Sequence, residues 1–146
     1  MTENFPPEFY RLIIEQAPDA VLFSDRDGLI RLWNRGAELI FGYSAAEALG
    51  QSLDLIIPER LRGRHWEGYH RTMATGQSRY GTDLLSVPAL HKDGRQLSCV
   101  FSIVMLEDEQ GKPVGVASIM RDNTATFEKE KALKQQLADL EGKPGQ

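Results

Sequence analysis

Apolar residues recur along the chain at two different spacings, and the changes of spacing divide it into helical and extended segments. An apolar face at helical spacing opens the chain at Phe5, Phe9, Leu12 and Ile13. Two prolines lie within this stretch, and proline suits a helix start because it lacks the N–H that a first turn leaves unpaired. The pattern predicts a short amphipathic helix at the N-terminus.

The next segments predict a hairpin followed by short helices. Residues 19–33 contain two apolar stretches around "DRDG", a turn in which glycine can take a positive φ, and this is typical of a β-hairpin. From residue 34 the spacing becomes helical. We expect one helix to end near Gly42, a second to be capped by Ser44, and a third to run from about residue 60 to residue 75.

Three strands are expected after these helices: residues 80–90, "RQLSCVFSIVML" and "PVGVASIMR". In the second strand, alternate positions place one apolar set on a single face: Leu97, Cys99, Phe101, Ile103 and Met105. The opposite face of this strand is only partly polar. We therefore expect one face to cover a core and the other to carry a helix or a partner.

The C-terminal segment "ATFEKEKALKQQLADLEG" has helix-forming composition, with Leu133, Leu137 and Leu140 at coiled-coil spacing. This leucine seam spans barely two turns, and isolated helices of that length are marginal in water. We interpret residues 1–17 as a capping and dimerisation helix, residues 18–123 as the core, and residues 124–146 as a linker helix and tail.

Composition limits the classes of partner. The chain has 146 residues, 41% of them hydrophobic, which is enough for one domain with one core. Its net charge of −4 favours neither nucleic acid nor an anionic membrane as a partner. The N-terminus lacks the pattern of a signal peptide, so a cytoplasmic location is expected. The single cysteine, Cys99, excludes an intramolecular disulfide framework.

Several of these motifs resemble those of PAS domains over about residues 8–126. The resemblance rests on "PDAVLFSDRDGLIRLWNRGAELIFGYSAAEALGQSLDLIIPE", on "KDGR" and on "GVASIMRDNT", in which Asn123 replaces the isoleucine of an "RDIT" ending. It implies an α+β fold with a five-stranded antiparallel sheet and short helices on one face, often around a ligand pocket. It also implies sensing or protein interaction, because PAS domains usually serve as input modules for kinases, cyclases or transcription regulators.

The stretch "RLRGRHWEGYHRT", residues 60–72, is similar to the heme-bearing helix of oxygen-sensing PAS kinases. This resemblance implies His65 as the proximal iron ligand and Arg71 as a partner of a heme propionate. At about 100° per residue, His65 falls on the apolar arc, whereas Arg71 falls on the opposite side. The position of the distal arginine in those kinases corresponds to Leu85. Two interpretations of His65 stay open: an iron ligand, or a side chain that packs inside the domain.

A flavin photoadduct is not expected. Light-sensing PAS domains carry a Gly-x-Asn-Cys-Arg-Phe-Leu-Gln motif, whereas the corresponding region here reads "GQSLDLIIPER" and has no cysteine. The motifs of serine hydrolases, zinc proteases and phosphate-binding loops are also missing, so no catalysis is predicted. The candidate residues for a pocket or a heme site are His65, Tyr69, Arg71, Arg79, Leu85, Val87, Phe101 and Ile103. The apolar members of this set would equally suit a solid core.

These observations predict a non-catalytic sensory module that binds a small ligand or a partner. The signal would pass through the terminal helices and through a homodimer interface formed by the N-terminal helix and the open sheet face, to a downstream signalling protein. The alternative is a heme-based gas or redox sensor that uses His65.

Overall fold

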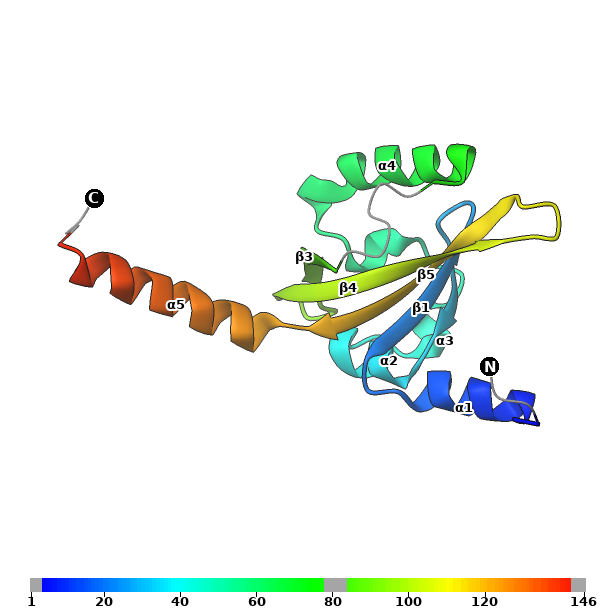
Figure 1. The fold of residues 1–146 in the computed structure, drawn as a ribbon, viewed down its shortest axis with the longest axis horizontal. Helices are drawn as coiled ribbons and strands as arrows, with labels where there is room; N and C mark the ends of the chain where they lie inside the picture. Colours follow the sequence, from blue (N-terminus) through cyan, green and yellow to red (C-terminus); the bar gives the residue numbers. More distant parts are fainter. Residues whose placement is uncertain (1–3, 78–83, 143–146) are drawn as a thin grey trace.

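The sheet combines two strands from the first part of the chain with three strands from the last part. Strand β5 lies at its centre and pairs with one strand of each group. The computed structural model describes residues 4–77 and 84–142, and within them the strands pair antiparallel in the order β2-β1-β5-β4-β3 (Figure 1). The strands are β1 (Ala20–Asp25), β2 (Ile30–Trp33), β3 (Leu85–Leu90), β4 (Gln96–Glu107) and β5 (Pro113–Asp122). The predicted α+β architecture is confirmed.

The helices flank this sheet. They are α1 (Pro7–Gln16), α2 (Arg35–Phe41), α3 (Ala45–Ala48), α4 (Arg62–Thr75) and α5 (Thr124–Leu140). Two 3-10 turns, Leu53–Ile56 and Glu59–Leu61, lead into α4. The strand predicted from residue 80 begins at Leu85, and residues 80–83 lie outside the described residues.

Local chemistry explains where the first elements turn. In the β1–β2 hairpin, the Asp25 carboxylate accepts hydrogen bonds from the backbone N–H groups of Asp27 and Leu29, and Gly28 takes a positive φ of 78°. The expected cap at Ser44 is confirmed by a reciprocal capping box with Glu47.

The buried amide of Asn34 joins three elements. Its Nδ2 donates to the carbonyls of Ile14 and Asp19 at 2.8 and 3.0 Å. Its Oδ1 accepts from the backbone N–H groups of Val21 and Ala37 at 2.8 and 2.9 Å. Asn34 thereby caps α2 and fixes the end of α1 and the start of β1 against it.

The inner face of the sheet carries the core. On β4, Leu97 and Cys99 are buried, and Phe101, Ile103 and Met105 pack against the same core while remaining half-buried. The face predicted for this strand is therefore confirmed. Burial raises the pKa of the Cys99 thiol to about 12, which makes it unreactive at neutral pH.

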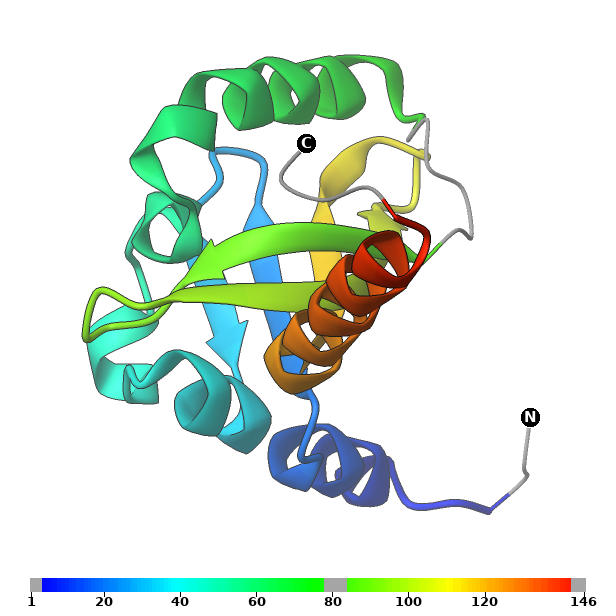
Figure 2. The ribbon, with the colours of Figure 1, turned by 90° about the vertical axis from the view of Figure 1, so that its left-hand side faces the viewer.

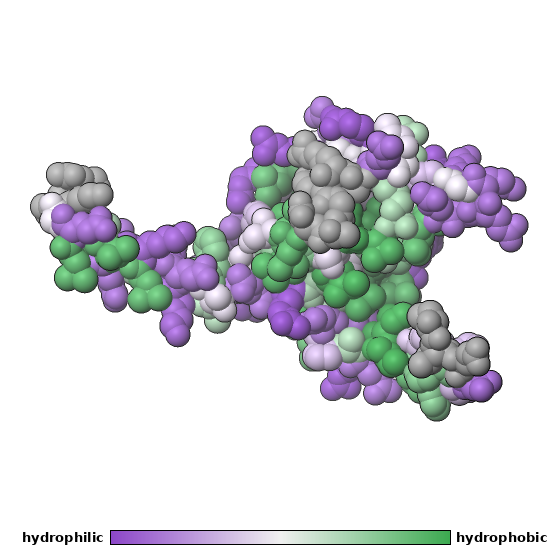
Figure 3. Space-filling model, viewed as in Figure 1, coloured by the Kyte–Doolittle hydropathy of each residue, from purple (hydrophilic) through white to green (hydrophobic). Residues whose placement is uncertain are grey.

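The outer face of the sheet stays open in the described part of the chain. The register of β4 and β5 places Val104 beside Ala117, and Ile119 beside Ser102 and Val21. Val104 is 46% exposed and Ile119 is 39% exposed. Apolar side chains gather over the sheet and around α1 in Figure 3. An uncovered apolar surface of this kind is a candidate interaction face.

Both terminal helices also expose apolar side chains. Helix α1 contacts α2, yet none of its residues is buried, and Phe9, Leu12 and Ile13 face solvent. Helix α5 leaves the sheet and projects away from it (Figures 1 and 2), with no buried residue. Its exposed leucines are Leu133, Leu137 and Leu140.

Candidate functional site

Tyr69 attaches α4 to the inner face of the sheet. Its hydroxyl lies 3.0 Å from Ser24 Oγ and also donates to the carbonyl of Asp25 at the end of β1. Ser24 is buried. Tyr69 and Met73 are the two buried residues of α4. Burial raises the pKa of the Tyr69 phenol, so the hydroxyl stays protonated.

Trp66 makes a second attachment, at the turn of the β1–β2 hairpin. Its Nε1 donates to Asp54 Oδ1 at 2.7 Å, and its ring lies over Gly28. A Cβ atom at Gly28 would lie 2.1 Å from the Trp66 ring, so only glycine allows α4 to approach this closely.

His65 lies one turn before Tyr69 on the same side of α4. Its ring centroid is 4.7 Å from that of Trp66 and 5.7 Å from that of Tyr69. Its Nδ1 atom is buried and has no hydrogen-bond partner among the described residues. Burial lowers the pKa of His65, and the charge of Asp54 opposes this only in part. The ring is therefore neutral at neutral pH and carries an unsatisfied polar atom.

Of the described polar side chains on α4, Arg71 and His70 lie on its exposed side. Arg71 lies on the exposed side of α4, where its Nη2 is 3.4 Å from Glu67 Oε1. His70 is exposed, with its ring stacked 5.9 Å from that of Trp66. Arg79 lies outside the described residues.

The apolar candidates share the inner face of β3 and β4. Leu85 pairs with Phe101 and Val87 pairs with Cys99, and direct partners in an antiparallel ladder share a face. Ile103 continues this face along β4. Leu85, Val87, Phe101 and Ile103 are only half-buried.

On each strand the half-buried residues lie toward one end, with the boundary between Val87 and Ala89 on β3 and between Cys99 and Phe101 on β4. At the other end the inner residues Ala89, Leu97 and Cys99 are 2%, 3% and 0% exposed. The helical layer therefore covers one end of the β3–β4 inner surface fully and the other end incompletely. A surface of this kind is suited to an apolar ligand.

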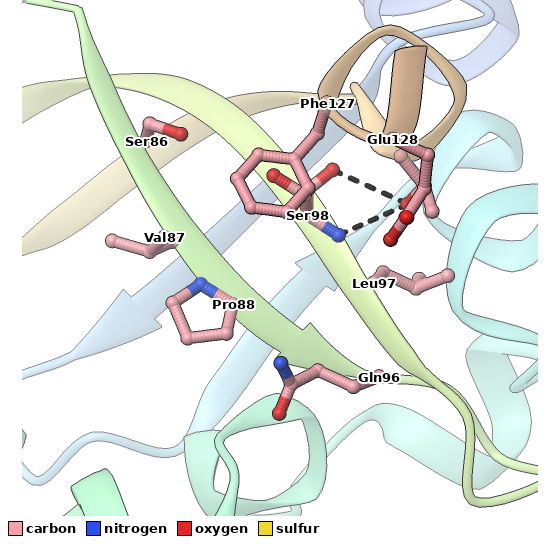
Figure 4. Close-up of a pocket in the computed structure, with 9 residues that line it drawn as sticks. Ser86, Val87, Pro88, Gln96, Leu97, Ser98, Phe127 and Glu128 are labelled. Atoms are coloured by element: carbon pink, nitrogen blue, oxygen red, sulfur yellow. Dashed lines mark hydrogen bonds between the residues drawn. The ribbon is translucent and has the colours of Figure 1, made fainter. Parts of the chain in front are cut away.

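A hollow that the sequence analysis did not predict lies at the start of α5. It measures about 250 Å³ and is lined by Ser86, Val87, Pro88, Gln96, Leu97, Ser98, Thr124, Phe127 and Glu128 (Figure 4). The Thr124 hydroxyl accepts a hydrogen bond from the Ser98 N–H at 3.0 Å, which ties α5 to β4. In the sequence, the only hint of this contact is Thr124, the last residue of "RDNT".

The residues around α4 fit a heme in part. A neutral, inward-facing imidazole with an unpartnered buried nitrogen suits an iron ligand. The apolar inner ends of β3 and β4 suit the macrocycle. Arg71 does not fit the role of a propionate partner in this arrangement, because it pairs with Glu67 on the solvent side.

Comparison with known proteins identifies the family to which this arrangement belongs. The family described as the PAS fold matches residues 8–123. The chain belongs to the PAS family. It is thus a PAS sensory and signalling domain, and the family is generally non-catalytic.

Two curated relatives carry sensory names. Sensor protein FixL of Bradyrhizobium diazoefficiens is 42% identical over 55 residues, which is 38% of this chain and 11% of that protein. Oxygen sensor protein DosP of Escherichia coli is 27% identical over 132 residues, which is 90% of this chain and 16% of that protein. The PAS domain therefore matches only a small part of the length of each relative.

Solved structures show the same fold. The PAS domain of a protein from Colwellia psychrerythraea has a TM-score of 0.70 at 24% identity, covering 81% of this chain and 97% of that chain. An RNA-binding light-oxygen-voltage receptor has a TM-score of 0.75 at 18% identity, covering 94% of this chain and 40% of that chain. Within residues 4–77 and 84–142, no helix has the length and apolar character to cross a membrane.

We expect the buried His65 imidazole to lower the stability of the PAS domain in acid. Its pKa in the folded chain lies below the ordinary value of 6.5, so the unfolded chain binds a proton first as the pH falls. The unfolding free energy is therefore unaffected by this group well above pH 6.5, and it decreases as the pH falls from 6.5 toward the lower pKa of the folded chain. Urea unfolding at about pH 7.5 and about pH 5.5 measures the decrease.

Two variants assign the effect to the residue. His65→Gln should show a smaller loss of unfolding free energy between the two pH values than the wild type. His70→Gln removes an exposed histidine whose charge is the smallest of the causes that act on the His65 pKa, so it should keep most of the wild-type loss. An undiminished loss in His65→Gln would contradict the prediction.

Proposed function

We propose that this PAS domain binds a small apolar ligand between α4 and the inner face of β3 and β4, and transmits its presence to the terminal helices. The observation that carries the proposal is the half-buried apolar surface at Leu85, Val87, Phe101 and Ile103. Burying such a surface under a ligand is favourable by roughly 25 cal/mol per Å² of apolar area.

The sheet supplies the connection to the rest of the domain. Alternate residues of β4 point inward to this surface and outward to the open face, so a shift of the strand changes both. Strand β5 lies between β4 and β1 and leads directly into α5. A ligand that changes the packing of β4 therefore acts on the strand that precedes α5.

We further propose that a second copy of the chain covers the outer face. The open sheet face and the apolar side of α1 are both uncovered in the described chain, and a twofold dimer buries such faces reciprocally. The leucines of α5 would then lie near those of the partner, which would stabilise a helix that has no buried residue of its own. An effector protein remains the downstream partner in this proposal.

Binding of a fluorescent apolar probe tests the ligand site. Anilinonaphthalene sulfonate should bind the wild type saturably with an increase in fluorescence. Ile103→Phe adds bulk on the inner face, away from the hollow at the start of α5, and should weaken binding by about tenfold or more, which is at least 1.4 kcal/mol. Val100→Phe adds the same ring at a half-buried outer position of β4 and should leave binding unchanged. Weakening by Val100→Phe alone would place the dye on the outer face and contradict the proposal.

The mass in solution tests the dimer. Light scattering after size exclusion should give the wild type the mass of two chains, because the uncovered sheet face is apolar. Val104→Glu places a charge on that face and should give the mass of one chain. Leu49→Glu is the matched control, since Leu49 is 45% exposed and lies at the end of α3. Wild-type monomer, or equal dissociation by both variants, would contradict the proposal.

The second candidate function is a heme-based gas or redox sensor, favoured by the unpartnered buried nitrogen of His65. Heme would supply an iron centre that responds to a gas or to its own oxidation state. His65 would hold the iron, and the apolar inner ends of β3 and β4 would exclude water. Leu85 stands where the resemblance to oxygen-sensing PAS kinases implies a gas-binding arginine, so that arginine would be missing here.

An absorption titration with hemin tests this candidate. The wild type should give a stoichiometric Soret band that shifts on reduction with dithionite and on addition of CO. His65→Ala should lose the protein-bound spectrum, whereas His70→Ala should keep it. An unaltered band in His65→Ala, or a wild-type spectrum no different from free hemin, would reject His65 as the ligand.

A further inference from the structure

Asp19 and Arg121 form an ion pair at the point where the β1–β5 ladder ends. The last backbone partners at this end are Ala20 and Met120. One residue further, Arg121 Nε and Nη2 donate to the two Asp19 carboxylate oxygens at 2.9 and 3.0 Å. The side chains thus extend the pairing of the two strands by one residue, in the bidentate geometry that orients both groups.

Both chain segments leave the sheet at this pair. Asp19 comes three residues after the end of α1 at Gln16, and Arg121 comes three residues before the start of α5 at Thr124. The pair therefore joins the base of the N-terminal helix to the base of the C-terminal helix.

The α1 side of the junction is held rigidly. Asn34 Nδ2 donates to the carbonyls of Ile14, Ala17 and Asp19 at 2.8, 3.3 and 3.0 Å. A Cβ atom at Gly36 would lie 2.0 Å from the Asp19 carbonyl oxygen, so α2 presses directly on this backbone. These contacts connect the end of α1 to Asp19 without an unattached linker between them.

The α5 side is held in the same way. The backbone N–H of Asn123 donates to the Ser98 carbonyl at 2.7 Å, and Thr124 Oγ1 accepts from the Ser98 N–H at 3.0 Å. The Asp122 carboxylate accepts from the Thr124 N–H at 2.9 Å. The three residues after Arg121 therefore transmit its position to the first turn of α5.

We propose that the Asp19–Arg121 pair couples the orientation of α1 to that of α5. The inference rests on the relay through the terminal helices proposed above and identifies the contact that carries it. Asp19 and Arg121 are positioning residues in this scheme, and they act on the helices through the junction backbone.

The location of the pair also makes it sensitive to what covers the sheet. Asp19, Ile119 and Arg121 border one shallow hollow on the outer face. The Arg121 side chain is 71% exposed and that of Asp19 is 31% exposed, so water screens the pair in an isolated chain. A second copy seated over Ile119 would exclude this water and strengthen the pair. Covering the outer face would thereby tighten the link between the two helices.

The experiment measures the distance between the helices directly. Spin labels at Glu8→Cys in α1 and Lys134→Cys in α5, both at exposed positions, report their separation by pulsed electron resonance. Cys99 is buried with a pKa of about 12, so it takes up little label. Dilution with unlabelled chain restricts the signal to distances within one chain.

Loss of the Asp19–Arg121 pair should broaden the distribution of distances between α1 and α5. In Asp19→Asn and in Arg121→Gln, the population outside the main distance peak should rise by about two- to fivefold, the range that an exposed ion pair supports. Asp19→Arg combined with Arg121→Asp should restore the narrow distribution. Arg31→Gln, which removes a pair of 2.8 Å at the other end of β1, should leave it unchanged.

Each outcome decides the proposal. Broadening in the single variants with recovery in the charge exchange supports it, whereas a wild-type distribution in Asp19→Asn overturns it. Equal broadening in Arg31→Gln also overturns it, because the effect would then be general loosening. Light scattering on the same samples reports dimerisation separately. A monomeric wild type would reject the proposed dimer. The distances within one chain would still test the coupling between α1 and α5.

Discussion

The PAS domain depends on a single buried amide at the place where helix, strand and helix meet. A polar group inside a protein must find hydrogen-bond partners, and Asn34 satisfies this requirement with backbone groups from α1, β1 and α2 at once. The amide therefore fixes where the first strand enters the sheet. Every later strand is positioned relative to β1, since β5 pairs with it and β4 pairs with β5.

The candidate site follows from how α4 is attached to that frame. Tyr69 and Trp66 hold the helix at β1 and at the hairpin turn, but no described residue covers Leu85, Phe101 and Ile103 in a comparable way. His65 lies on the attached side of the helix with a nitrogen that no described residue satisfies. One side of the layer between α4 and the sheet is thus closed by hydrogen bonds, and the other is left apolar and partly open.

The sequence predicted the parts of this arrangement that depend on near neighbours. The alternation of Leu97 and Cys99 with polar residues, the cap at Ser44 and the inward face of α4 are all local patterns. The contact of Tyr69 with Ser24 joins residues 45 positions apart, and that of Arg121 with Asp19 joins residues 102 positions apart. No periodicity encodes such contacts, because they depend on the register of strands that come together only in the folded chain.

The twofold alternation along β4 also has an evolutionary consequence. Under the proposed function, substitutions at Phe101 and Ile103 would change which ligand the inner face binds, whereas those at Val100 and Val104 would change which partner the outer face contacts. Strand β4 therefore carries two interleaved sets of positions that can mutate nearly independently of each other. With the proposed ligand site and dimer, evolution could change the ligand while the dimer interface is preserved, or change the partner while the ligand site is preserved.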